Sequence, residues 1–516
     1  MTIRKLLAAL SLAFVVASPV VAQKPAPAKK PAAKTVAART ADPLAGLDDY
    51  IRKAMREWNM AGLSIAIVKN DSVVYARGFG LKELGKPDSV TPRTLFAIGS
   101  NTKSFTSAAV GMLVDEGKMS WDDKVTKWLP GFQLFDPYVT RELTMRDILS
   151  HRSGLGRRGD MLWIAADYPR AEILRRMRFL EPNAGFRTEM GYNNMMFLAA
   201  GEAAGAAAGM SWDELVTTRI LRPLGMTTST TRFADLSGRP DLASPHGRRD
   251  GTLQLIPRRD IDNIAPAGSI FSSAEEMTHY LRFILGGGKY QGKTLLKAGS
   301  LATIHTPHVS MFTPPDTLRP STHFMAYGLG WVLQDYLGRK IAWHNGGIDG
   351  YLSEMWTVPE EKLGVVILTN SDNHALGSAL AARILDAYLG GTPRDWSALT
   401  LERFKAAMAM QEAQQKQAEA ARVKDTKPTH PLEAYAGTYA DSLYGDLRVS
   451  VSGDHLVAAY GVGGLTGELS HWHFDTFRST WSDRQLGRGM ISFGLDKDGK
   501  PASVTVEGLA TFKRSK

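Results

Sequence analysis

The chain has 516 residues and contains no cysteine. This absence excludes disulfide bonds, a thiol nucleophile and the lipid attachment that requires a cysteine behind an export signal. Two catalytic signatures are missing as well, since no serine lies within a complete Gly-x-Ser-x-Gly and no His-Glu-x-x-His occurs. The α/β-hydrolase nucleophile elbow and the zinc-protease helix are therefore excluded.

Acidic residues are missing from the first 41 positions, which hold seven lysines and arginines. Without these seven charges, only three of the ten net positive charges remain for the rest of the chain. The basic balance therefore belongs to the leading segment, and the nearly neutral body gives no reason to expect nucleic acid as a partner.

This leading segment has the layout of a secretory signal peptide. A basic start, Met1–Lys5, precedes the apolar run Leu6–Val21, and the small residue Ala22 marks the expected cleavage point. Because the run is short and interrupted by alanine, serine and proline, we expect a signal peptide over residues 1–22 rather than a retained anchor. After cleavage we expect no stable membrane span, and the cysteine-free chain suits the bacterial periplasm or the medium.

The segment after the signal is of a different kind. Residues 23–43 are largely proline, alanine and lysine, with hardly any large apolar side chain. Such a segment cannot bury enough surface to fold, so the composition predicts a disordered linker.

Residues 44–392 combine strand and helix patterns in an order that indicates one domain. Two β-branched runs, 62–69 and 72–80, flank a two-residue polar turn and predict a hairpin near the start. Strand patterns return only at 340–368, while the region between is mainly helical. A sheet built from both ends of the segment with helices inserted between them is an α+β, three-layer domain.

Two local signals in this domain give sharper expectations. The pattern predicts a single helix over Arg141–Leu149. Ser273 followed by Glu276 has the spacing of a capping box, which predicts the start of another helix.

The remaining residues divide into a connector and a small module. Residues 393–430 are the expected connector, in which Leu401–Val423 is rich in alanine, glutamine, glutamate and lysine and predicts a polar helix that ends before Pro428. Residues 431–516 show short strands and turns, which predict a small β-barrel or sandwich. His471 and His473 share one strand face but lack a third ligand, so we expect neither a metal nor another cofactor.

The clearest chemical signal is a serine followed three residues later by a lysine at the start of a helix. Residues three apart share a helix face, so the Lys103 amine can reach the Ser100 hydroxyl. The unpaired N–H groups and the dipole at a helix start favour an alkoxide and disfavour an extra proton on the lysine. Ser100 is therefore a candidate nucleophile, although the same pattern also fits an N-capping serine.

Two later stretches offer the other groups that a serine nucleophile needs. Tyr192 precedes a predicted helix, and a phenol beside a cationic lysine loses its proton more easily, so it is a candidate general base and acid. Asn194 offers an amide for a substrate carbonyl. After a predicted strand, Gly346 and Gly347 allow a substrate backbone to approach, and the Gly347 N–H is a candidate partner of the Ser100 N–H in an oxyanion hole.

His151 is a less favoured candidate. It lies in the stretch Leu149–Leu155 and has the chemistry of a triad base, but its polar neighbours favour a role in organising a loop near the site.

These motifs, in this order, resemble the serine β-lactamase-like hydrolases, which include class C β-lactamases, penicillin-binding DD-peptidases, D-aminopeptidases and carboxylesterases. The likeness covers about residues 45–390 and extends to Leu149–Leu155, to Pro223–Met226 and to Ala267–Ser273. It implies a three-layer α/β/α domain with an antiparallel sheet and an inserted helical region. The all-β C-terminal region is similar to the module found behind such hydrolase domains.

Position by position, the resemblance implies that Ser100 forms an acyl-enzyme, that Lys103 and Tyr192 share proton transfer, and that Asn194 binds substrate. His344 stands where β-lactamases and many penicillin-binding proteins have the lysine of a Lys-Thr-Gly motif. A histidine can hold a substrate carboxylate only when it is protonated, and the His-x-Gly form looks more like the D-aminopeptidase and esterase side of the family.

The sequence therefore predicts an exported serine hydrolase that acts on a small-molecule or peptide substrate. A peptidase or amidase on small peptides, including peptides with D-residues, is the leading expectation. A carboxylesterase is the first alternative, and a penicillin-binding sensor or weak β-lactamase is the second.

Overall fold

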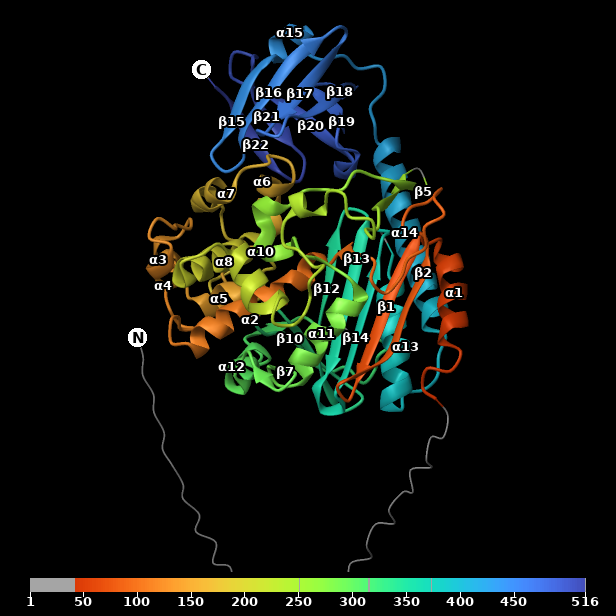
Figure 1. The fold of residues 1–516 in the computed structure, drawn as a ribbon. Helices are drawn as coiled ribbons and strands as arrows, with labels where there is room; N and C mark the ends of the chain where they lie inside the picture. The colour runs from red at the N-terminus through yellow and green to blue at the C-terminus, as the bar shows by residue number, and fades with distance from the viewer. Residues whose placement is uncertain (1–41, 250, 314–315, 373, 516) are drawn as a thin grey trace, which may run out of the picture. The chain divides into compact units, whose positions relative to one another are not determined.

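The computed structural model describes residues 42–249, 251–313, 316–372 and 374–515 (Figure 1). The expected signal peptide and all but the last two residues of the expected linker lie outside these ranges. Within them, no helix is both long and apolar enough to cross a bilayer. The described chain has an α+β part with one large sheet, a long helix and a closed β-barrel, which confirms the fold class predicted from the sequence.

Eight antiparallel strands form the large sheet in the order β2-β1-β14-β13-β12-β11-β10-β9. The N-terminal hairpin closes on the last strand of the sheet, with Leu63 opposite Thr369. Its turn residues Asn70 and Asp71 have φ of 51° and 61°, as a type I′ turn requires. The strands are β1 Gly62–Lys69, β2 Ser72–Gly80, β9 Val309–Met311, β10 Met325–Tyr327, β11 Val332–Tyr336, β12 Arg339–Ile348, β13 Tyr351–Val358 and β14 Leu363–Thr369.

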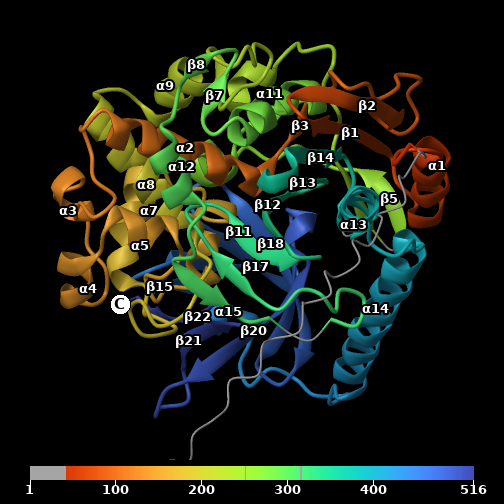
Figure 2. The same cartoon turned by 90° about the horizontal axis from the view of Figure 1, so that it is seen from below.

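Helices cover both faces of this sheet (Figure 2). On one face α13 packs against β13 and β14, with α1 and α14 beside it, and on the other face α11 packs against β1 and β14. Every residue of β14 is buried, as expected for a strand covered on both sides. These helices are α1 Leu47–Trp58, α11 Ala274–Leu285, α13 Leu376–Leu389 and α14 Trp396–Ala420.

The helical region beside the sheet is built around α2 and α8, which contact each other. Its helices are α2 Thr102–Asp115, α3 Val125–Trp128, α4 Pro137–Glu142, α5 Met145–Leu149, α6 Met161–Ile164, α7 Arg170–Arg176, α8 Asn194–Ala208, α9 Trp212–Val216, α10 Ala265–Gly268 and α12 Ala298–Ile304. Three two-stranded sheets complete it, formed by β3 Phe96–Ala97 with β6 Phe271–Ser272, β4 His246–Arg249 with β5 Thr252–Leu255, and β7 Lys289–Tyr290 with β8 Lys293–Thr294.

The single helix expected over Arg141–Leu149 is wrong, because α4 ends at Glu142 and α5 begins at Met145. The break is set by Thr144, whose hydroxyl oxygen accepts from the Asp147 N–H while the Asp147 carboxylate accepts from the Thr144 N–H. This reciprocal capping box starts a new helix in the middle of the expected one.

The capping box expected at the start of α11 is half right. Ser273 caps the helix by accepting from the Glu276 N–H. The Glu276 carboxylate instead accepts from the backbone N–H groups of Thr228 and Ser229, each at 2.8 Å. It therefore ties α11 to a neighbouring loop rather than to its own first turn.

The C-terminal strands close into an eight-stranded antiparallel barrel in which each strand pairs with the next and β15 pairs with β22. Buried and exposed residues alternate along β16, as in a barrel whose interior is filled with side chains. After α15, Leu432–Tyr435, the strands are β15 Gly437–Asp441, β16 Gly445–Ser452, β17 His455–Tyr460, β18 Leu465–His473, β19 Thr476–Trp481, β20 Arg488–Leu495, β21 Pro501–Val506 and β22 Ala510–Arg514.

Candidate active site

Ser100 lies on the 3₁₀ turn Gly99–Asn101, directly before α2 and against β12. Ser353 of β13 fixes this turn, because its Oγ accepts from Asn101 Nδ2 and donates to the Ile98 carbonyl, both at 2.7 Å. Ser100 is partly exposed, whereas Asn101 and Lys103 are buried. The candidate nucleophile is therefore accessible to solvent, on a turn that hydrogen bonds to the buried Ser353 keep in place.

The Lys103 amine lies at the centre of the site. Its Nζ is 2.9 Å from Ser100 Oγ, and it donates to Asn194 Oδ1 and to the Ala267 carbonyl, both at 2.8 Å. The side chain is completely buried. The structure thus brings together the serine and the lysine that the sequence placed three residues apart.

Burial lowers the pKa of Lys103 well below its ordinary value, which the nearby Asp160 carboxylate opposes and the Arg157 guanidinium reinforces. A neutral amine has two N–H groups and one lone pair. Two carbonyl-type oxygens occupy the two N–H groups, so the lone pair is left for the Ser100 hydroxyl proton. In this state Lys103 can act as a general base toward Ser100.

Tyr192 precedes α8, and its hydroxyl donates to Ser100 Oγ at 2.8 Å. Burial raises the pKa of Tyr192 well above its ordinary value, and the hydrogen bond with Ser100 and the charge of Arg157 offset this only in part. Burial therefore opposes the easier proton loss that the sequence led us to expect for this phenol beside a cationic lysine. Burial favours the neutral form of both groups, so Tyr192 starts as a proton donor and Lys103 as the base.

Asn194, the first residue of α8, has protein partners at both ends of its side-chain amide. Its Oδ1 accepts from Lys103, and its Nδ2 donates to the two carboxylate oxygens of Asp160 at 3.2 and 3.4 Å. Asp160 also accepts from Trp163 Nε1 and from Arg157 Nε, each at 3.0 Å. In this structure Asn194 orients Lys103, and Asp160, which the sequence analysis missed, fixes which end of the amide faces the lysine.

His151 shapes the segment that carries Tyr192. Its carbonyl accepts from the Gly191 N–H at 2.7 Å, and its Nδ1 accepts from the Asn193 N–H at 3.2 Å. Its ring lies 4.3 Å from the Tyr192 ring, centre to centre. These contacts agree with the loop-organising role expected for His151, and no hydrogen bond joins its described atoms to Ser100.

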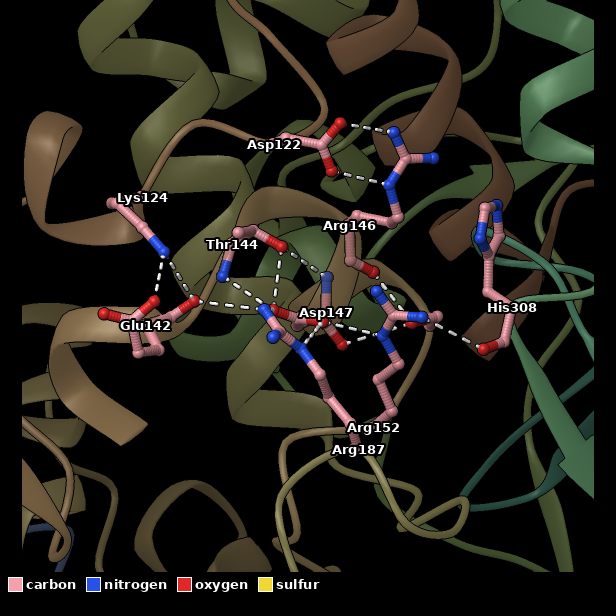
Figure 3. Close-up of polar contacts among 10 residues, drawn as sticks. Asp122, Lys124, Glu142, Thr144, Arg146, Asp147, Arg152, Arg187 and His308 are labelled. Carbon is pink, nitrogen blue, oxygen red and sulfur yellow. Dashed lines mark hydrogen bonds and ion pairs between the residues drawn. The ribbon is translucent and has the colours of Figure 1, made fainter. Parts of the chain in front are cut away.

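A buried carboxylate, Asp147, binds two arginines that lie far apart in the sequence, Arg152 next to His151 and Arg187 ahead of Tyr192 (Figure 3). It binds Arg152 Nε at 2.6 Å and Arg187 Nη2 at 2.7 Å, and its side chain has no exposed surface. The Arg187 N–H also donates to the Arg152 carbonyl at 2.9 Å. Asp147 was not among the residues predicted from the sequence, although the capping-box spacing of Thr144 and Asp147 could have indicated a structured carboxylate.

His344 of β12 is buried with both ring nitrogens occupied. The Tyr327 hydroxyl donates to Nε2 at 2.9 Å, and Nδ1 donates to the Asn345 carbonyl at 2.6 Å. Burial and the nearby Lys103 lower the pKa of His344 to about 3. The ring is therefore neutral over the physiological range and offers no free N–H for a substrate carboxylate.

Gly346 and Gly347 bring β12 against the Ser100 turn. A Cβ on Gly346 would lie 1.9 Å from the Ile98 carbonyl and 2.8 Å from the Ser100 nitrogen, so no side chain fits there. A Cβ on Gly99 would likewise lie 2.7 Å from the Gly347 nitrogen. The Ser100 and Gly347 N–H groups thus lie on adjoining backbone segments, the arrangement that an oxyanion hole needs.

One stretch of the sequence matches a phosphate-binding motif without having the structure of one. Gly287–Thr294 fits the letters of a phosphate-binding loop, but it forms the short antiparallel pair β7 and β8 instead of a loop between a strand and a helix. Among the described residues, no group of three His, Asp or Glu side chains is placed to hold a metal.

The model of the family described as Beta-lactamase matches residues 47–389, which span the sheet, the helical region and every site residue named above. The chain belongs to the Beta-lactamase family. This confirms the resemblance drawn from the motifs, and it makes the chain a serine hydrolase of that family. A second family model, described as a domain of unknown function (DUF3471), matches residues 421–515, which include the barrel.

Individual relatives support the assignment. This hydrolase is 30% identical over 430 residues to "Unguisins hydrolase ungD" of Aspergillus violaceofuscus, covering 77% of this chain and 75% of the relative. It is 24% identical over 328 residues to "Protein flp" of Staphylococcus aureus strain COL, covering 63% and 62%. Its fold is similar to the octameric penicillin-binding protein homologue from Pyrococcus abyssi, with a TM-score of 0.60, 22% identity and coverage of 90% of this chain and 99% of that one.

Proposed function

We propose that this hydrolase cleaves amide bonds in small peptides through an acyl-enzyme on Ser100. The observation that carries the proposal is the placement of Ser100 Oγ between the buried Lys103 amine at 2.9 Å and the half-buried Tyr192 phenol at 2.8 Å. Because burial favours the neutral form of both groups, the nucleophile has a proton acceptor on one side and a proton donor on the other.

Acylation uses these two groups in opposite senses. The Ser100 proton moves to the Lys103 lone pair as Oγ attacks the substrate carbonyl carbon, and the Ser100 and Gly347 N–H groups receive the oxyanion. When the C–N bond breaks, Tyr192 gives its proton to the leaving nitrogen. The acyl-enzyme then holds a lysine ammonium and a tyrosine phenolate.

Deacylation reverses both transfers. The Tyr192 phenolate takes a proton from water as the water oxygen attacks the ester carbonyl. The Ser100 oxygen leaves with the proton held on Lys103, which restores the resting site and releases a carboxylic acid.

The proton donor beside Ser100 is the reason to favour amides over esters. An amine is a poor leaving group until its nitrogen is protonated, whereas an activated alcohol can leave with less assistance. Relatives include a protein named "Unguisins hydrolase ungD", and hydrolysis by this chain is compatible with that name. The neutral His344 gives no support to an enzyme that anchors a β-lactam carboxylate at this position.

We also propose that the hydrolase is exported, because its N-terminal residues have the layout of a cleavable signal peptide. The absence of cysteine suits such a location.

The reaction is tested with Ser100→Ala and a matched serine control. We expect Ser100→Ala to reduce turnover to the background rate, and Lys103→Ala and Tyr192→Phe each to lose at least about 100-fold, since each removes a proton-transfer partner. Ser107→Ala is the control, because Ser107 is buried on α2 and its hydroxyl has no described hydrogen-bond partner. Near wild-type turnover by Ser100→Ala would refute the proposal.

The substrate class is tested with one acyl group presented as two compounds, a p-nitroanilide and a p-nitrophenyl ester. Sustained turnover of D- or L-aminoacyl anilides, together with an intact-mass increase equal to the acyl group less one hydrogen, supports the amidase. Turnover of the ester alone would establish a carboxylesterase instead. A single burst of product from both compounds, or from a chromogenic cephalosporin, with no further turnover would indicate a penicillin-binding sensor.

A further inference from the structure

The barrel, which matches a family without an assigned function, contacts the part of the hydrolase domain that carries Asp160. This segment runs from the 3₁₀ turn Arg157–Asp160, named η2, through α6 to α7. Barrel turns reach it at two places: the turn between β15 and β16, and the turn between β17 and β18, where the Val462 N–H donates to the Ala166 carbonyl at 2.8 Å. Figure 1 shows α6 and α7 beside the barrel end that bears these turns.

The turn between β15 and β16 makes the contact closest to the active site. The Tyr444 hydroxyl donates to the carbonyl of Arg158, within η2. The Tyr444 carbonyl accepts from the Tyr168 hydroxyl at 3.2 Å, and Arg176 donates to the Leu443 carbonyl at 3.0 Å. Tyr444 and Tyr168 are both buried, so this is a closed contact rather than a solvent-bridged one.

The contact continues directly to the reacting groups. Arg158 and Asp160 share the one turn η2, so a constraint on the Arg158 carbonyl limits how the Asp160 side chain is presented. Asp160 accepts from Asn194 Nδ2, and Asn194 Oδ1 accepts from Lys103 beside Ser100. Four hydrogen bonds and one turn of backbone thus join a barrel tyrosine to the candidate nucleophile.

We propose that the C-terminal barrel is a positioning element of the active site, in which Tyr444 holds η2 so that Asp160 keeps Asn194 and Lys103 aligned with Ser100. The proposal rests on the proposed function in so far as Ser100 and Lys103 carry the reaction. It assigns Tyr444 and Asp160 as positioning residues, since neither reaches Ser100 itself, and it gives the barrel a part in the chemistry that does not require it to touch the substrate.

The test compares Tyr444→Phe with Tyr460→Phe. Tyr444→Phe removes one hydroxyl and keeps the buried ring, whereas Tyr460 is a buried barrel tyrosine whose hydroxyl has no described hydrogen-bond partner. We measure the rate at which a fluorophosphonate probe labels Ser100, and kcat and KM on an aminoacyl anilide. Thermal unfolding of the full-length variants checks that each is folded.

We expect Tyr444→Phe to slow Ser100 labelling and to lower kcat about three- to tenfold with KM unchanged, the effect of losing one buried hydrogen bond. Tyr460→Phe should match the parent. Asp160→Asn should slow Ser100 labelling more than Tyr444→Phe does, because it directly weakens the hydrogen-bond partner of Asn194.

A double-mutant cycle decides whether Tyr444 acts through Asp160. If it does, adding Tyr444→Phe to Asp160→Asn has no further effect on the labelling rate. Independent effects, which multiply in the double variant, would overturn the proposal, as would a Tyr444→Phe rate equal to that of Tyr460→Phe. Failure of the probe to label Ser100 in the parent is a separate outcome, which would overturn the proposed function and this proposal with it.

Discussion

The neutral state of Lys103 can be tested by folding stability, independently of any substrate. Lys103 is completely buried, and burial lowers its pKa, whereas in the unfolded chain a lysine titrates near its ordinary value of about 10.4. Below that pH, unfolding of a chain with neutral Lys103 takes up one proton. The folded-state pKa is the lower one, so stability falls as the pH falls from the unfolded value toward the folded value.

The size of the effect follows from proton linkage. One proton taken up on unfolding changes the free energy of unfolding by about 1.36 kcal/mol per pH unit, rising with pH. If Lys103 is neutral in the folded protein from pH 7 to pH 9, wild type gains about 2.7 kcal/mol over this range relative to Lys103→Met, which has no group to titrate there.

The assay is urea unfolding of both proteins in identical buffers, followed by the fluorescence of the 11 tryptophans. Taking the difference between wild type and Lys103→Met at each pH cancels the titration of all other groups. A difference that stays constant from pH 7 to pH 9 would show that Lys103 carries the same charge folded and unfolded. That result would refute its assignment as the resting base.

Two further predictions concern the loop network and the N-terminus. Asp147→Asn should lower the free energy of unfolding by about 3–5 kcal/mol, because it leaves Arg152 and Arg187 without their buried carboxylate; a loss below about 1 kcal/mol in urea unfolding would contradict this, and Glu412→Gln, which breaks an exposed ion pair on α14, should leave the midpoint unchanged. Export predicts that protein recovered from the periplasm or medium begins at Gln23, and a mature chain that still begins at Met1 would rule out signal cleavage.

Much of the fold could be predicted from local pattern. The hairpin over 62–80 was correct because its strand periodicity and its turn residues are strong and continuous. The helix expected over Arg141–Leu149 failed because a capping box inside it outweighs the apolar spacing. Glu276 shows the limit of such rules, because its carboxylate accepts hydrogen bonds from a loop almost fifty residues away in sequence.

The residues of the candidate site also differ in whether the sequence alone could predict them. Ser100, Lys103 and Tyr192 could be predicted because chemistry restricts which residue types can do their work, and the structure brings all three together. Asp160 could not, because an aspartate in a polar turn has no distinguishing spacing and gains its meaning only from contact with Asn194. The direction of the pKa of Tyr192 also escaped sequence reasoning, because it depends on how deeply the finished fold buries the ring.

The pairing of β1 with β14 has a consequence for how the chain is made. The strand that follows α1 finds its partner about three hundred residues later, with Leu63 opposite Thr369, so the large sheet cannot close until nearly the whole hydrolase domain has been synthesised. Until then one edge of β1 can pair with β2, but the other edge lacks its hydrogen-bonding partner β14. We therefore expect the active form to appear only after β14 has been synthesised, and a product truncated before β14 to be inactive.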